Sequence, residues 1–279
     1  MRSKIFISGN SDKAGCEDLV KRVVQFLESN EKAEVVGVGS GRDIVLPDSP
    51  IDLMVCLGGD GSFLNLVDAV IERAIPILGI NFGRLGFLTA GLASRMEALI
   101  QDHLDGHTEV FERLSLKLEL VPIDGGAHKV FYALNDVVVA TPNMGHVVNL
   151  HVKVSGEPIF LFRGDGMVIS TPTGSTGHSL SAGGSLVDPQ IEALLLTPLS
   201  PQSLSSRPLV VRPTAKVEVG VSGEQGNAQL LYDGKPLGLV KPGDVVRVSR
   251  SEYSVKMVQP KDFRFFNRLA DKLGWSESF

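Results

Sequence analysis

The apolar residues of the first hundred positions follow two alternating spacings. Short continuous apolar runs, which are typical of buried strands, occur at residues 4–8, 34–38, 52–57 and 75–80. Between and after them, apolar residues recur at helical spacing over residues 17–28, 62–73 and 94–103. This rhythm predicts parallel strands joined by crossover helices, an arrangement that binds ligands at the carboxyl ends of the strands.

The spacing changes after about residue 111. Strand-like runs separated by Gly, Pro, Asn and Ser occupy residues 114–121, 130–140, 147–154, 167–171, 215–221, 229–232 and 244–250. We therefore expect an α/β domain over residues 1–110 and an all-β domain, packed as a sandwich, over residues 111–255. Helical spacing returns at residues 262–274, with Phe265, Phe266, Leu269 and Leu273 on one side, so residues 256–279 are predicted to form a tail that packs on the first domain.

Composition and charge exclude several classes of protein. The 279 residues are 43% apolar, which is enough for a large core, and the formal net charge of −5 with scattered Lys and Arg argues against a nucleic-acid partner. No apolar stretch approaches membrane-spanning length, so we expect no membrane partner. Cys16 and Cys56 are the only cysteines and no Cys/His spacing suits a metal, so we expect a cytoplasmic protein without a metal cage of its own.

The most informative motif is Leu57-Gly-Gly-Asp-Gly61, which lies between an apolar run and a helical pattern. A strand that ends in glycines presents backbone N–H groups to an anion and directs one carboxylate into the same crevice. The alternative is a tight turn in which the glycines relieve strain and Asp60 caps the helix. Capping does not require three glycines, so we favour a phosphate-handling site with Asp60 at its chemical centre.

Further polar segments lie at strand ends. Ser170-Thr-Pro-Thr-Gly-Ser-Thr-Gly-His178 supplies a dense row of hydroxyls and amides, and residues 81–87 form a glycine-containing loop after a buried strand. Asn135-Asp136 interrupts an apolar strand, so the two side chains either meet a ligand or lie wet at an edge or bulge, and both interpretations stay open. Asp165-Gly166 read alone indicates a hairpin turn, and Asp233-Gly234 predicts an ordinary hairpin followed by Lys235.

These motifs together resemble the bacterial NAD kinases over nearly the whole chain. The segments that carry the resemblance are Gly58-Gly-Asp-Gly61, Asn81-Phe-Gly-Arg-Leu-Gly-Phe-Leu88, Asn135-Asp136, Asp165 to Thr176, Ser179-Leu-Ser-Ala-Gly-Gly184, Ser206-Arg-Pro-Leu209 and Phe265-Phe-Asn-Arg to Leu-Gly-Trp275. The glycine-aspartate motif is shared with lipid kinases and phosphofructokinases, whereas Thr-Pro-Thr-Gly-Ser-Thr is much more specific. The resemblance implies a Rossmann-like N-terminal domain and a β-sandwich C-terminal domain.

The resemblance also implies a reaction, the transfer of the γ-phosphoryl group of ATP, or of polyphosphate, to the adenosine ribose 2′-hydroxyl of NAD. It implies Mg²⁺ as cofactor, ATP as co-substrate and a homodimer or homotetramer. Asp60 then corresponds to the catalytic base. The implied substrate-binding residues are Gly61, Phe87, Asn135, Asp136, His146, Arg163, Asp165, Thr173, Thr176, Gly177, His178, Ser179, Leu180, Ser181 and Lys235.

The chain departs from the family pattern at three places. Asp136 stands where most relatives have Glu, Gly177-His178 replaces an Ala-Tyr pair, and Lys235 replaces a residue that is often polar and uncharged. These changes affect the expected details of substrate packing more than the reaction. Two rival functions remain to be separated by experiment: a lipid or sugar kinase with the same motif, and a non-catalytic NAD(P)-binding sensor.

Overall fold

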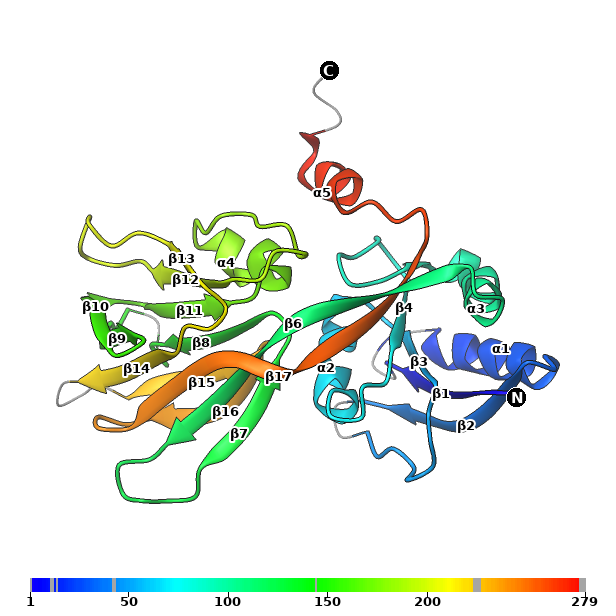
Figure 1. Cartoon of the computed structure of the whole chain (residues 1–279), viewed down its shortest axis with the longest axis horizontal. Helices are drawn as coiled ribbons and strands as arrows, with labels where there is room; N and C mark the ends of the chain where they lie inside the picture. The colour runs from blue at the N-terminus through cyan, green and yellow to red at the C-terminus, as the bar shows by residue number, and fades with distance from the viewer. Residues whose placement is uncertain are drawn as a thin grey trace. The chain divides into compact units, whose positions relative to one another are not determined.

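The computed structural model describes residues 2–10, 13, 15–41, 44–143, 145–222 and 227–275, and it separates into two compact units (Figure 1). Unit 1 comprises residues 1–112 and 255–279, and unit 2 comprises residues 113–254. In the described part of the chain, no helix is long and apolar enough to cross a membrane.

Unit 1 is an α/β layer structure. Its elements are β1 (Ser3–Gly9), α1 (Cys16–Glu28), β2 (Ala33–Ser40), β3 (Leu53–Leu57), α2 (Asp60–Val70), β4 (Ile77–Asn81), β5 (Gly91–Leu92), the 3₁₀ turn η1 (Ala93–Arg95), α3 (Met96–Leu104), the end of β17 (Val245–Pro260) and α5 (Phe265–Leu273). The strands pair in parallel in the order β2-β1-β3-β4. On the far side of β4, β17 pairs through Met257 with Ile77, and β5 pairs with Ile80 and Asn81.

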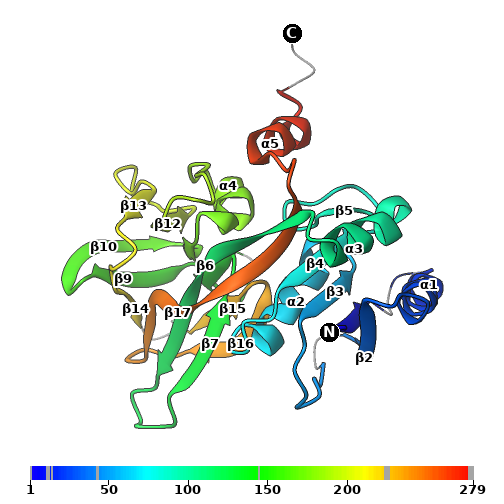
Figure 2. The ribbon, with the colours of Figure 1, turned by 45° about the vertical axis from the view of Figure 1, so that its right-hand side comes forward.

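Helices cover both faces of this sheet. Alternate strand residues such as Ile5, Val55 and Leu78 pack with Val23 of α1 and Leu99 of α3 in one apolar cluster. The other face meets α2, where a Cβ added to Gly79 of β4 would lie 3.2 Å from the Phe63 ring. Figures 1 and 2 show α1 beside β1 and β2, and α2 beside β3 and β4. The predicted alternation of strand and helix is therefore confirmed.

Unit 2 contains two antiparallel sheets. Its elements are β6 (Thr108–Val121), β7 (Lys129–Ala133), β8 (Asp136–Ala140), β9 (Val148–Val154), β10 (Glu157–Gly164), β11 (Gly166–Ser170), η2 (Thr173–Thr176), α4 (His178–Ser181), β12 (Leu194–Leu199), β13 (Leu209–Val211), β14 (Val217–Ser222), β15 (Ala228–Tyr232), β16 (Lys235–Val240) and the first part of β17. One sheet has the order β10-β9-β14-β17, with β6 beside β17 and β7 beside β6. The other sheet has the order β13-β12-β11-β8-β15-β16.

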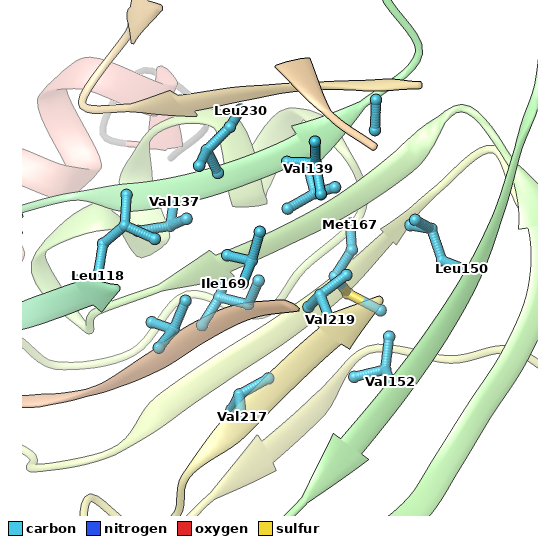
Figure 3. Close-up of a cluster of buried hydrophobic side chains, with 14 of the residues drawn as sticks. Leu118, Val137, Val139, Leu150, Val152, Met167, Ile169, Val217, Val219 and Leu230 are labelled. Atoms are coloured by element: carbon cyan, nitrogen blue, oxygen red, sulfur yellow. The ribbon is translucent and has the colours of Figure 1, made fainter. Parts of the chain in front are cut away.

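The two sheets enclose an apolar core. Leu150, Val152, Val217 and Val219 come from the first sheet, and Val137, Val139, Met167, Ile169 and Leu230 from the second; Figure 3 shows these side chains gathered between the strands. Strands such as β9 and β14 alternate buried with more exposed residues, as a sheet with one covered face requires. The expected combination of an α/β domain and a β-sandwich is confirmed.

The C-terminal helix α5 contacts other segments of unit 1. The guanidinium group of Arg268 donates a hydrogen bond to the carbonyl oxygen of Thr89, and just before the helix the rings of Phe263 and Phe111 lie 6.0 Å apart, edge to face. Leu269 is the only buried residue of the helix, whereas Phe266, predicted on its apolar side, is 63% exposed.

Candidate active site

Asp60 follows β3 and two glycines and is the first residue of α2. Its Oδ2 accepts a hydrogen bond from the backbone N–H of Phe87 at 2.8 Å, and its Oδ1 accepts one from the N–H of Leu88 at 3.0 Å. The helix-capping alternative is therefore wrong: Gly59 is the N-cap, and no side chain caps the helix. The carboxylate is instead fixed by the loop that follows β4.

Two glycines leave room for this arrangement. A Cβ on Gly86 would lie 1.9 Å from Asp60 Oδ1, and a Cβ on Gly58 would lie 2.2 Å from the Ser62 hydroxyl oxygen. A Cβ on Gly61, by contrast, would have no atom within 4 Å, so the side of the motif at Gly61 is open. The glycines of this motif therefore allow close backbone approach on one side and leave space on the other.

The loop over residues 81–88 is held by its own polar side chains. Asn81 Nδ2 donates to the Arg84 carbonyl at 2.8 Å, Asn81 Oδ1 accepts from the Gly83 N–H at 3.1 Å, and Thr89 Oγ1 accepts from the Gly86 N–H at 3.1 Å. A loop with this many internal bonds holds Asp60 in one orientation, which is what a positioned proton acceptor needs.

Basic groups surround this loop. A cavity of about 770 Å³ in unit 1 lies between the loop, the β5 region and α5, and it is lined by the basic residues Arg84, Arg95, Arg264, Arg268 and Lys272 and by the acidic residues Asp262 and Asp271. Burial lowers the pKa of Arg268, while the negative charge of Asp60 raises it. On the glycine motif itself, Lys13 Nζ lies 3.6 Å from the place of a Cβ on Gly59. Neither Lys13 nor this cavity could be predicted from the sequence, because the residues involved meet only in the folded unit.

In unit 2, Asn135 and Asp136 lie where the chain leaves β7 and enters β8. A Cβ on Gly177 would be 3.7 Å from Asn135 Nδ2 and 4.0 Å from Asp136 Oδ2, so both side chains point toward this glycine. Asn135 Oδ1 is buried and has no hydrogen-bond partner in the described structure. Burial raises the pKa of the Asp136 carboxyl to about 6. Two interpretations were left open for this pair. The one that places the side chains in solvent at an edge or bulge is wrong for Asp136, because this residue is only 6% exposed.

The hydroxyl-rich segment forms two short helical turns, η2 and α4. Thr176 Oγ1 bonds to the Thr173 carbonyl at 3.2 Å, and the buried Ser179 hydroxyl bonds to the Thr197 hydroxyl at 2.9 Å. Gly177 joins the two turns, and His178 and Ser181 are exposed while Leu180 is partly buried. The structure thus brings Gly177 together with Asn135 and Asp136, and it directs the Ser179 side chain into the domain.

The other predicted site residues are spread over unit 2. His146 is exposed in the connection from β8 to β9, and Arg163 is exposed on β10, paired with Asn149 of β9. Asp165 links β10 to β11, which belong to different sheets, so the hairpin interpretation of Asp165-Gly166 is wrong. Lys235 begins β16, and its Nζ lies 5.1 Å from the centre of the Tyr232 ring.

Asp233 is a residue whose importance the sequence did not reveal. The predicted hairpin is present, since Tyr232 pairs with Lys235 and both Asp233 and Gly234 have positive φ angles of 44° and 74°. The Asp233 carboxylate, however, turns inward and accepts the N–H groups of Leu134, Asn135 and Asp136. Burial raises the pKa of Asp233 to about 7, although these three donors act to lower it.

A carboxylate fixed at the carboxyl end of a parallel sheet, beside glycine backbone and basic side chains, defines an enzyme of the phosphotransferase class. The comparisons with known proteins agree with this class. Residues 43–108 match the ATP-NAD kinase N-terminal domain, and residues 134–260 match the ATP-NAD kinase C-terminal domain. The chain belongs to the NAD kinase family, which confirms the resemblance seen in the motifs and the prediction of a kinase enzyme.

Individual relatives and solved structures are similar to most or nearly all of the chain. The NAD kinase of Symbiobacterium thermophilum is 36% identical, with 95% of this chain and 96% of the relative covered; the NAD kinase of Gemmatimonas aurantiaca is 44% identical, with 82% and 79% covered. The NAD kinase of Archaeoglobus fulgidus in complex with ATP superposes with a TM-score of 0.73 at 26% identity, covering 98% of each chain. Yeast NADH kinase complexed with NADH shares the fold, with a TM-score of 0.90 at 24% identity and coverage of 100% and 89%.

Proposed function

We propose that this chain transfers the γ-phosphoryl group of ATP to the adenosine ribose 2′-hydroxyl of NAD, with Asp60 as the proton acceptor. The single observation that carries the proposal is the fixed orientation of the Asp60 carboxylate, whose two oxygens each accept one loop N–H group. Each oxygen keeps a further lone pair, so one of them can accept the proton of an approaching hydroxyl.

The chemistry needs little more from the protein than position and charge. In the loose transition state of phosphoryl transfer, the ribose oxygen forms its bond to phosphorus as the bond to ADP breaks, and the hydroxyl proton passes to Asp60. Because a ribose hydroxyl is a very weak acid, the carboxylate acts mainly by orienting it and accepting its proton as the new bond forms. The open side of the motif at Gly61 is where we place the acceptor, with Phe87 beside it.

The acceptor nucleotide is assigned to unit 2. Asn135 and Asp136 offer one amide and one carboxyl group toward Gly177, a hydrogen-bonding pattern suited to the amino and hydroxyl groups of an adenosine. We keep as proposed contacts the residues of the turn, Thr173, Thr176, Gly177, His178, Ser179, Leu180 and Ser181, together with His146, Arg163, Asp165 and Lys235. For Ser179, whose hydroxyl is bonded within the domain, the proposed contact is through its backbone.

The donor is assigned to the basic cavity of unit 1. Five basic and two acidic side chains line it, and Arg84 belongs to the same loop as the amides that hold Asp60. Net positive charge attracts the polyphosphate of ATP, and polyphosphate itself is the alternative donor with the same chemistry. The affinity of Archaeoglobus fulgidus NAD kinase for ATP, evident from its complex, favours ATP.

Mg²⁺ fits this site as an ion carried by the donor. In the described residues no group of three or more His, Cys, Asp or Glu side chains is placed to hold a metal, whereas Mg²⁺ is commonly held by phosphate oxygens and one or two carboxylates. Asp262 and Asp271, which line the basic cavity, are the carboxylates we propose for it. The ion supplies charge neutralisation on the phosphate oxygens.

Two properties of the whole protein complete the proposal. We place the enzyme in the cytoplasm, because both cysteines are buried free thiols, as a reducing compartment allows. We also propose a homodimer or homotetramer, supported by the exposed Phe266 and Trp275 on and beside α5, and light scattering of the purified protein measures this directly.

The decisive experiment mixes the purified chain with Mg²⁺-ATP and NAD and measures NADP with an NADP-specific dehydrogenase. Asp60→Asn should bind NAD and lose turnover, and Asp68→Asn, on the exposed face of the same helix, should keep it. NAD binding without turnover in the unmodified protein would favour the sensor, and turnover with lipid or sugar acceptors would favour the other rival kinases. Near-normal activity of Asp60→Asn would contradict the role of Asp60.

A further inference from the structure

Two residues satisfy every backbone polar group of the segment Leu134–Asp136. The Asp233 carboxylate accepts the N–H of Leu134 at 2.7 Å through Oδ2, and those of Asn135 at 2.7 Å and Asp136 at 3.1 Å through Oδ1. The Asp233 N–H donates to the Asp136 carbonyl at 2.9 Å. Thr171 donates to the other two carbonyl oxygens of the segment: its hydroxyl bonds to that of Leu134 at 2.6 Å, and its backbone N–H bonds to that of Asn135 at 2.9 Å.

This segment needs such support because it crosses between the sheets of unit 2. β7 pairs with β6 in one sheet, whereas β8 pairs with β11 and β15 in the other. The backbone between them leaves one ladder before it joins the next, and Leu134 is fully buried, so water cannot replace the missing strand partner. The Asp233 carboxylate therefore replaces the backbone acceptors of a neighbouring strand for three consecutive N–H groups.

The same segment carries the two side chains that we assigned to the acceptor nucleotide. Asn135 and Asp136 point toward Gly177, and Asn135 Oδ1 is buried without a partner in the described structure. A backbone fixed at all of its polar groups can hold such side chains ready for a ligand, because little conformational freedom is left to lose on binding. A freely moving segment would let Asn135 turn and satisfy itself elsewhere.

We propose that Asp233 is a positioning residue of the acceptor site: its carboxylate fixes the backbone of Leu134–Asp136 and thereby directs Asn135 and Asp136 toward the bound nucleotide. This inference rests on the proposed function for its ligand. Asp233 contacts the nucleotide site only through the backbone that it holds, and it takes no part in the phosphoryl transfer itself.

The chemistry of the side chain explains why an aspartate stands here. An ionised carboxylate only accepts hydrogen bonds, so it matches three N–H donors that converge on it. In Asp233→Asn one oxygen becomes an NH₂ group, which faces an N–H group donor to donor. The substitution keeps the size of the side chain and the turn, since Asn also adopts positive φ readily.

The experiment compares Asp233→Asn with a matched control in the same unit. Asp244 is also buried, and its two oxygens accept the N–H groups of Ile123 at 2.9 Å and Lys241 at 2.8 Å, so Asp244→Asn removes a comparable turn carboxylate that holds neither Asn135 nor Asp136. Hydrogen exchange of residues 130–140, measured in the protein without ligand, and the steady-state constants for NAD and for ATP are determined for both variants.

We expect Asp233→Asn to accelerate exchange in this segment and to raise KM for NAD by about tenfold or more, with KM for ATP and kcat at saturating NAD changed by less than about threefold. Asp244→Asn should leave all of these values near those of the unmodified protein. Faster exchange with an unchanged KM for NAD would overturn the proposal, as would an equal effect of the control.

A second variant keeps the test open if Asp233→Asn does not fold. Thr171→Val removes the hydroxyl's bonds to the Leu134 carbonyl and to the Gly174 N–H while keeping the backbone bond to Asn135, and we expect a smaller increase in KM for NAD. An unchanged KM with faster exchange would again refute the proposal. Exchange is measured without ligand, so a chain that does not use NAD would still show faster exchange in this segment. Failure of the proposed function can therefore be distinguished from failure of the proposed role of Asp233.

Discussion

The α-carbon of Gly86 approaches the Asp60 carboxylate so closely that a Cβ at residue 86 would lie 1.9 Å from Oδ1. No side chain fits between them, since real contacts of this kind are nearly twice as long. The glycine in the loop and the carboxylate at the start of α2 are therefore a matched pair, although 26 positions separate them in the sequence.

We predict from this pair that Gly86→Ala lowers kcat by about 100-fold without unfolding the protein. The new methyl group must push the Asp60 carboxylate out of its place, and a misplacement of about 1 Å can reduce kcat by about 100-fold. The measurement is kcat with saturating Mg²⁺-ATP and NAD. Gly83→Ala is the control in the same loop, because a Cβ there would have no atom within 4 Å. Equal activity of the two variants would show that the carboxylate position does not limit the rate.

Arg268 provides a test of the basic cavity. The side chain is partly buried, bonds to the Thr89 carbonyl and interacts with the charge of Asp60. We predict that Arg268→Gln raises KM for ATP about tenfold, since one charge-assisted contact to phosphate is lost, while KM for NAD stays the same. Arg73→Gln serves as control, because Arg73 also bonds to backbone carbonyls of unit 1, those of Pro47 and Ser49, but does not line the cavity. A selective loss of NAD affinity would contradict the assignment of the cavity to the donor.

The buried carboxyls of unit 2 predict opposite effects of pH on stability and on binding. Burial raises the pKa of Asp136 to about 6 and that of Asp233 to about 7, from an ordinary value near 4. The folded state therefore holds more protons than the unfolded state between about pH 4 and pH 7, so the stability these groups contribute is present below pH 4 and is lost as the pH rises through 7.

The measurement is the free energy of unfolding by urea between pH 5 and pH 8 for the unmodified protein and for Asp233→Asn. The stability of the unmodified protein relative to the variant should fall as the pH rises, because Asn does not titrate. NAD affinity should change in the other direction, since protonation at acidic pH removes acceptors for the N–H groups of Leu134–Asp136. A difference in stability that is constant with pH would contradict the raised pKa of Asp233.

Phe63 tests what holds α2 beneath the site. Its ring is fully buried against Gly79 of β4, so Phe63→Ala should leave a cavity and lower the free energy of unfolding by about 3–5 kcal/mol. Phe266→Ala, at a 63% exposed position of α5, should change it by less than about 1 kcal/mol. Urea denaturation of both variants gives the comparison. A large effect at Phe266 would mean that the exposed ring is covered in solution, as an oligomer would do.

Much of the fold was predictable because its signals are local. Buried parallel strands have continuous apolar sequences, and strands with one covered face alternate apolar and polar residues. The parallel sheet of the α/β domain and the antiparallel sheets of the β-sandwich could therefore be predicted. The position of Asp60 was predictable for the same reason, since the end of an apolar run followed by glycines marks the carboxyl end of a strand.

The features that could not be predicted from the sequence depend on contacts between residues far apart in the chain. Asp233-Gly234 has the local sequence of a hairpin and forms one, yet its carboxylate binds an N–H group 98 residues away, at Asn135. Asp165-Gly166 has a similar local sequence but joins two different sheets. Local turn chemistry fixes φ angles and cannot tell which strands the flanking residues will pair with. The capping role considered for Asp60 was wrong because the loop amides 27 and 28 residues later compete for the carboxylate.

The return of β17 to unit 1 couples the completion of that unit to residues far along the chain. Residues 1–112 precede unit 2 in the chain, yet Ile77 of β4, which pairs with Met54 of β3 on one side, meets Met257 of β17 on its other side only after residues 113–254 have been made. Until then, part of the β4 edge lacks that covering strand, and an uncovered edge can pair with other chains. Unit 1 therefore gains this strand only after the residues of unit 2 have been made, and a chain interrupted before β17 would expose the part of the β4 edge that Met257 otherwise covers.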